Sequence, residues 1–214
     1  MLFGVETQEE VMEKRILRYI LVAGSMLMVP TQAQAALKSG EAVFAVHGKH
    51  TVVKTRFFSL ALRGSGATFY NPNEKKHFIF GYLGLAGTFL FERDSSLTLH
   101  VLGGPVEGHG SPGHLFSVWA HLSLFKRVSI FSEIDLYFTG QAPIVYSVHD
   151  VDVVVWKCLT LGAELETFGS AVSLGPLVQI NFGPLVVGYA HLFSVQQNPV
   201  THRSRFYVKV FFGK

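Results

Sequence analysis

The stretch HLFSVWAHLSLFKRVSIFSEIDLYFT, residues 114–139, decides the fold. On both sides of Lys126-Arg127, apolar residues alternate with polar or small ones. A period of two is typical of a β-strand with one apolar face, and the basic pair marks a tight turn between two such strands. The stretch therefore predicts an antiparallel hairpin. In its second half, the polar positions include Glu133 and Asp135.

The composition of the whole chain has too little charge for an ordinary soluble domain. Of its 214 residues, 49% are hydrophobic and 15% are charged, against about 25% charged residues in average soluble proteins. The formal net charge of +3 is small and dispersed, which gives no support to nucleic-acid binding. Lipid is the obvious alternative solvent for so apolar a chain, but composition alone does not decide between lipid and a large core.

The amino-terminal residues follow the pattern of a secretory signal peptide. A basic region precedes an uncharged apolar run over residues 19–29, and Ala33-Gln34-Ala35 supplies a small-x-small cleavage motif. The run is shorter than the roughly 20 residues of a spanning helix, so an uncleaved anchor is the weaker alternative. We expect residues 1–35 to be a cleavable signal peptide, with Met1 or Met12 as the start. Residues 36–214 then form the exported domain.

Alternation continues through the rest of this domain and marks further strands. No later stretch approaches 18 consecutive apolar residues, and no helical i, i+3, i+4, i+7 pattern is sustained. Many segments are close to the roughly 9–11 residues with which a tilted strand crosses a bilayer. The expected strands are 51–63, 77–92, 96–104, 114–125, 128–139, 143–156, 158–168, 171–182, 185–195 and 204–213.

The connections between these strands differ in length. Short turns alternate with longer segments at 64–76, 104–113 and 196–203, although 140–142 and 169–170 are short as well. Such alternation is typical of barrels with tight periplasmic turns and longer outer loops. We therefore predict an all-β fold, an antiparallel up-and-down transmembrane β-barrel of about ten strands with both chain ends on the periplasmic side. Eight or twelve strands are alternatives. Weak segments could merge to give eight strands, or segment 41–48 and another piece could form additional strands to give twelve.

These features together resemble the small outer-membrane β-barrels of Gram-negative bacteria. The resemblance covers residues 41–214 and includes the terminal strand RFYVKVFF at 205–212, although the chain ends in Gly213-Lys214 and not on Phe. It implies the bacterial outer membrane as location, with lipopolysaccharide and other membrane lipids around the barrel. It also implies insertion by the barrel assembly machinery. No single family is matched. No cofactor or metal is expected, because no histidine spacing matches a zinc signature.

The polar strand faces carry the candidate site. If the apolar faces meet lipid, the opposite faces point into the lumen, and the first and last strands become neighbours when the barrel closes. Three consecutive strands then supply an acidic wall: Glu133, Asp135, Asp150, Asp152, Glu164 and Glu166. The last and first strands supply a basic wall opposite it: Arg205, Lys209, Arg56 and Lys54.

Two hypotheses for this lumen follow. Opposed charged walls can orient and filter small polar solutes in a narrow pore, and an excess of acid favours cations. Alternatively the charges pair into a salt-bridged plug, since side chains nearly fill the interior of a small barrel and unpaired buried charges are costly. The predicted function is therefore a small porin-like channel for small polar solutes or a structural barrel with a charged lumen, without enzymatic activity.

Two other classes of protein are alternatives. A soluble exported barrel, similar to a lipocalin-like binder, would turn its apolar faces inward. An enzyme of the lipid A deacylase type is the second, because Gly188-Tyr-Ala-His191-Leu-Phe-Ser194 and the following Asn198-Pro199 are faintly similar to that family's motif. Side chains three apart in a strand point to opposite faces, however, which separates His191 from Ser194. No acidic residue follows Glu166.

Overall fold

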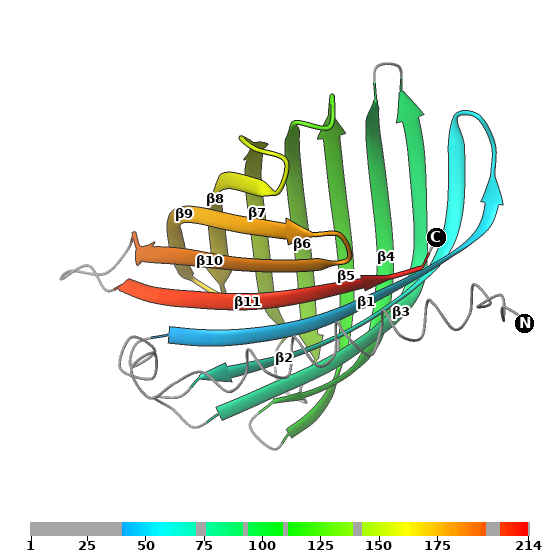
Figure 1. The fold of residues 1–214 in the computed structure, drawn as a ribbon. Helices are drawn as coiled ribbons and strands as arrows, with labels where there is room; N and C mark the ends of the chain where they lie inside the picture. The colour runs from blue at the N-terminus through cyan, green and yellow to red at the C-terminus, as the bar shows by residue number, and fades with distance from the viewer. Residues whose placement is uncertain are drawn as a thin grey trace, which may run out of the picture. The chain divides into compact units, whose positions relative to one another are not determined.

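The barrel domain is a single closed sheet of eleven strands (Figure 1). The computed structural model describes residues 40–71, 76–91, 94–108, 111–138, 143–195 and 202–213. The predicted signal peptide, residues 1–35, and the alternative start at Met12 lie outside these ranges. The strands are β1 (Gly40–Lys54), β2 (Phe58–Asn71), β3 (Lys76–Phe91), β4 (Ser95–Gly108), β5 (Ser111–Leu124), β6 (Val128–Phe138), β7 (Ile144–Val154), β8 (Leu159–Phe168), β9 (Ala171–Phe182), β10 (Leu185–Ser194) and β11 (His202–Phe212).

The all-β barrel is confirmed, with one strand more than the expected ten. The difference lies at the start of the sheet, where β1 and β2 share the predicted first strand 51–63 around a turn at 55–57. The weakly alternating segment 41–48 belongs to β1. Residues 64–71, predicted as part of a loop, continue β2, because Gly64, Gly66 and their small neighbours keep the strand backbone while weakening the apolar pattern. In the described part of the chain, no helix is long and apolar enough to cross a membrane.

The odd number of strands sets how the barrel closes. Consecutive strands are antiparallel, so β11 runs in the same direction as β1, and these two pair in parallel from Gly40 opposite Ser204 to Gly48 opposite Phe212. β1 therefore begins and β11 ends at opposite ends of the barrel. The expectation of both chain ends on one side, which assumed an even count, is wrong for this reason.

The connections between described strands are short at both ends of the barrel. Rim A is the end with the turns 55–57, 125–127, 155–158 and 183–184; rim B is the end with the turn 169–170 and the first residues of β1 and β11. The long loops predicted at 64–76 and 104–113 are not present as such, because most of their residues extend β2, β4 and β5. The predicted loop 196–203 lies largely outside the described residues.

The strands have one apolar face and one mixed face, as their period of two predicts. On β5, the outward Phe116 and Val118 are 42% and 40% exposed, whereas the inward Ser117 and Trp119 are 0% and 4% exposed. Comparable exposed apolar side chains form a belt on the outside of the barrel: Leu83, Leu85, Val101, Ile130, Ile134, Val151, Val153, Leu161, Val178 and Ile180. The outer surface is therefore apolar over much of its height.

The inward side chains pack into two apolar clusters. The larger one is rich in aromatic rings from β3 to β6: Phe80, Tyr82, Leu102, Val106, Leu115, Trp119 and Tyr137. The second lies on β1 and β9 to β11: Val43, Leu177, Val186, Ala190, Leu192 and Tyr207. The charged side chains of the interior lie among these clusters, so much of the space within the sheet is filled.

Candidate functional site: the charged interior of the barrel

The six carboxylates predicted as an acidic wall lie on the inner faces of three neighbouring strands. β6 carries Glu133 and Asp135, β7 carries Asp150 and Asp152, and β8 carries Glu164 and Glu166. The spacing of two within each strand keeps each pair on one face. The register then sets Asp150 directly opposite Glu164. All but Glu133 are more than nine-tenths buried, which makes the position of each counter-charge decisive.

Arg205 is the main counter-charge, and it reaches from β11 to carboxylates on β1 and β8. Its guanidinium donates to Glu164 Oε1 at 2.8 Å, to Glu41 Oε2 at 2.9 Å and to Glu166 Oε2. Arg203 contacts Glu166 Oε1 at 2.5 Å and Glu41 Oε1 at 3.1 Å. We call these five residues the ionic cluster. It lies towards rim B and has the paired arrangement of a salt-bridged plug.

Sequence reasoning missed two members of this cluster. Glu41 lies in the weakly alternating segment that was not assigned a strand of its own, and Arg203 lies one residue before the predicted last strand. The alternation along each strand was the available signal. Arg203 lies two residues before Arg205 and therefore points to the same face of the strand. Glu41 likewise shares a face with Val43 and Ala45. Their partnership with β8 depends on how the barrel closes, which the sequence does not specify.

The structure places Lys54 and Arg56 away from the carboxylates. Lys54 is the exposed last residue of β1, after a register shift between β1 and β2, and Arg56 is exposed in the turn 55–57. The first strands instead send Arg63 inward, with its guanidinium 5.0 Å from the centre of the Trp119 ring. The predicted basic wall therefore has Arg205 and Lys209 in the interior, while its first-strand part is at rim A.

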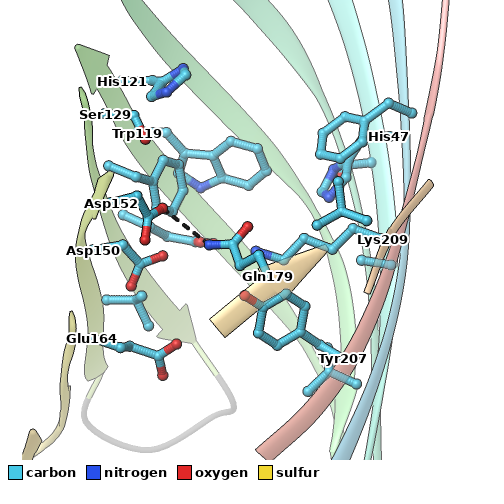
Figure 2. A pocket seen from close by; sticks show the side chains of 18 of the residues that line it. His47, Trp119, His121, Ser129, Asp150, Asp152, Glu164, Gln179, Tyr207 and Lys209 are labelled. Atoms are coloured by element: carbon cyan, nitrogen blue, oxygen red, sulfur yellow. Dashed lines mark hydrogen bonds between the residues drawn. The ribbon is translucent and has the colours of Figure 1, made fainter. Parts of the chain in front are cut away.

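A cavity of about 500 Å³ lies inside the barrel next to the ionic cluster (Figure 2). Figure 2 shows Asp150, Asp152 and Glu164 in a column on one wall, with Lys209 and Tyr207 projecting from the opposite side. The Lys209 ammonium lies over the Tyr207 ring, 4.6 Å from its centre. Between the walls, the amide of Gln179 donates to Asp152 Oδ2 at 3.0 Å. Acidic and basic side chains thus face each other across the cavity.

The cavity reaches rim A. Its lining includes Lys126 and Arg127 in the exposed turn after β5. That turn is tight, since Arg127 N donates to Leu124 O at 3.0 Å and both Phe125 and Lys126 have positive φ, 53° and 55°. Positive φ at both central residues is typical of a type I′ turn, whose twist matches that of the two strands it connects. Basic side chains therefore stand at the mouth of the cavity.

The ionic cluster borders the cavity towards rim B. Arg205 and Glu164 belong to its lining, whereas Glu41, Arg203 and Glu166 do not. On the rim B side of Arg205, the described interior is occupied by the remainder of the cluster and by buried apolar side chains such as Leu192, which is fully buried. The lining also includes Tyr137 and Tyr146, near the rim B ends of β6 and β7, and the ion pairs of Arg205 cross the interior there from β11 to β8.

Polar side chains also occur on the outer face, in two hydrogen-bonded groups. In the first group, Ser132 Oγ lies 2.8 Å from His149 Nδ1, and Ser147 Oγ lies 2.8 Å from Thr167 Oγ1. These groups satisfy one another across β6, β7 and β8. Mutual hydrogen bonding lowers the cost of placing such groups in an apolar environment.

The second outward group bears on the enzyme alternative. It joins Tyr189, His191 and Ser204, with His191 Nδ1 3.2 Å from Ser204 Oγ. Ser194 follows His191 by three residues in the same uninterrupted strand, β10, and therefore lies on the opposite face. His191 and Ser194 are accordingly not arranged as a base and its nucleophile.

Comparisons with protein-family models, with curated proteins and with solved structures found no match for this chain. Its function must be inferred from its own residues.

Proposed function

We propose that the protein is a membrane-spanning β-barrel of the bacterial outer membrane with an occluded lumen, a structural barrel with a charged interior and not an open porin-like channel. The observation that carries the proposal is the opposition of the two strand faces. Large apolar side chains are exposed outside, while the buried carboxylates and Arg205 are inside. A soluble barrel has the reverse arrangement, with its apolar faces towards a core.

The outer belt supports lipid as the surrounding medium. Exposed Leu, Ile, Val and Phe side chains on neighbouring strands, such as Ile130 on β6 and Val151 opposite it on β7, would form an extended apolar surface in water. Contiguous exposed apolar surface of this extent marks an interaction with a membrane or with another protein. Because the belt includes strands from β3 to β9, a surrounding bilayer fits it better than a partner docked on one side.

Strand length agrees with a bilayer. Strands β6 to β11 have 10 to 12 residues each. At about 3.3 Å per residue and a tilt of about 40°, such strands rise about 25–30 Å. The apolar band of outer-membrane barrels is about 25 Å tall. Closure by β1 and β11 also meets the requirement that no backbone edge is left unpaired in lipid.

The eleven strands depart from the even number found in bacterial single-chain barrels. The odd number makes the closing pair, β1 and β11, parallel. The described strands still form a closed sheet with no free edge. The alternating final strand β11, which ends in Phe211 and Phe212, supports insertion by the barrel assembly machinery. Lipopolysaccharide and phospholipid are the partners that the outer belt would contact.

The interior favours occlusion over conduction. Arg205 binds three carboxylates, and its ion pairs to Glu164 and Glu166 join β11 to β8 across the interior. An eight-stranded barrel is already filled by side chains, so eleven strands leave room for a pocket but for no wide pore. The charge pairs hold the interior closed because separating them would expose unpaired buried charges.

Fractionation and planar-bilayer recording test the two parts of this proposal. We expect the protein in the outer-membrane fraction, and we expect the refolded barrel to give no discrete channel openings. Recovery in the soluble periplasm would refute membrane insertion. Discrete openings of the wild type would refute occlusion and favour the porin-like alternative. A variant with Arg205, Glu164 and Glu166 each changed to Ser is the matched comparison, since it removes the ion pairs that join β11 to β8 and should conduct.

A further inference from the structure

The cavity is surrounded by polar atoms that lack hydrogen-bond partners. Seven buried side-chain atoms of the described residues have no partner, and six of them belong to residues that line this cavity. They are Asp150 Oδ1, Asp152 Oδ1, Trp119 Nε1, the Tyr207 hydroxyl, His100 Nδ1 and Arg63 Nε. Buried polar groups are almost always satisfied, so their convergence on one space indicates that something polar occupies it.

The two aspartates have the strongest unmet requirement. Asp150 and Asp152 are 5% and 8% exposed, and each has an oxygen with no donor. The second oxygen of Asp152 is bound by the neutral amide of Gln179. The arginines of the ionic cluster are engaged with Glu41, Glu164 and Glu166. Neither aspartate therefore forms an ion pair with a described side chain, although both face the cavity (Figure 2).

Away from its mouth, the cavity is lined by more carboxylates than cations, because Lys126 and Arg127 lie in the exposed turn at rim A. Its lining contains Glu133, Asp135, Asp150 and Asp152 in addition to the paired Glu164. The interior cations not committed to the ionic cluster are Lys209 and Arg63, and both lie over aromatic rings. An added cation would offset the remaining negative charge, because buried charges without a partner are costly.

The shape of the site favours an organic cation over a bare metal ion. No cluster of three or more His, Cys, Asp or Glu residues suited to hold a metal occurs in the described ranges. The volume of about 500 Å³ falls in the range of small-molecule pockets, about 300–1,000 Å³. Aromatic faces attract ammonium groups, and the rings of Trp119 and Tyr207 line the same space as the aspartates.

We propose that this cavity binds a small organic ammonium compound, which enters from rim A and donates hydrogen bonds to Asp150 and Asp152. A hydroxyl or carbonyl group on the same molecule would accept from the unpaired Trp119 Nε1 or the Tyr207 hydroxyl. This binding function goes beyond a structural barrel, and it does not depend on membrane insertion.

Ethanolamine is the probe, since it carries an ammonium and a hydroxyl group. Ethylene glycol is its neutral isostere, and potassium chloride controls for ionic strength. The chain has two tryptophans, so Trp156→Phe leaves Trp119 as the fluorescent reporter in the cavity. The barrel is titrated in a neutral maltoside detergent. We expect a saturable change with a Kd of about 0.1–10 mM, within the affinity available to so small a ligand.

Charge variants test the assignment. The double variant Asp150→Asn/Asp152→Asn should weaken binding at least tenfold, whereas Asp94→Asn, at an exposed rim A turn, should leave it unchanged. Lys209→Met keeps the test decisive if the double variant does not fold: removal of a competing cation should tighten binding at least threefold.

Four results would overturn the inference. They are no saturable change up to 100 mM ethanolamine, the same change with ethylene glycol or potassium chloride, unaltered affinity in the folded Asn variant, and unaltered or weaker affinity in Lys209→Met. If the titration fails while the barrel still inserts into membranes, only this inference falls.

Discussion

Replacement of Arg205 by Gln tests the ionic cluster at its centre. Arg203 would still contact Glu41 and Glu166 in the variant, but Glu164, which is 4% exposed, would lose its cation. Removing one partner of a buried ion pair costs about 3–5 kcal/mol. We therefore expect Arg205→Gln to lower the free energy of unfolding by about that amount. The assay is urea unfolding of the barrel refolded into lipid vesicles, followed by tryptophan fluorescence.

The matched control is an ion pair of similar geometry at the surface. Lys126 Nζ lies 2.7 Å from Asp94 Oδ1, with side chains 72% and 63% exposed. Exposed pairs contribute about 0–1 kcal/mol, so Lys126→Gln should have little effect. The double variant Arg205→Gln/Glu164→Gln should regain part of the lost stability, because it removes the orphaned charge. An Arg205→Gln loss no larger than that of Lys126→Gln would show that the cluster does not hold the interior together.

Two further substitutions test the outer face and a close strand contact. Val118→Arg, on the outside of β5, should destabilise the vesicle-inserted barrel by about 2–4 kcal/mol, against about 0–1 kcal/mol for Val155→Arg near rim A; equal effects would contradict a lipid-facing belt. A Cβ on Gly175 would overlap the backbone carbonyl of His191, so Gly175→Ala should cost about 1–3 kcal/mol in urea unfolding. Gly66→Ala is its control, because the nearest atom there is 3.7 Å away, and a similar loss at both glycines would refute the contact.

The strands that the sequence predicted best are those with strict alternation. β9 has the predicted bounds, and β6 and β10 differ from theirs by one residue. Alternation is informative there because a one-residue slip would turn every apolar side chain inward. In β1 and β2 the alternation is weak, since Gly64, Gly66 and their small neighbours do not distinguish an apolar face from a polar one. The extra strand and the parallel closure follow from that region.

The acidic residues of the site could be located from phase alone, but their partners could not. Asp150 and Glu164 lie inward because each shares the polar phase of its strand. Pairing of Glu164 with Arg205 depends on long side chains that meet inside the closed barrel. Arg56 was predicted to point inward from a strand, but it lies in a turn, where the alternation of a strand does not apply. The cavity itself depends on packing in three dimensions, which no period in the sequence encodes.

Accessibility of spin labels along β5 tests the central claim most directly, namely that the apolar faces meet lipid. Cys158 is the single cysteine, so a Cys158→Ser background allows one label at a time at residues 116–121 of the barrel in vesicles. The outward labels at Phe116, Val118 and Ala120 should collide frequently with oxygen, which concentrates in lipid, and rarely with a water-soluble nickel chelate. The inward label at Ser117 should collide little with either. Frequent collision of the outward labels with the nickel chelate would place that face in water and contradict the membrane barrel.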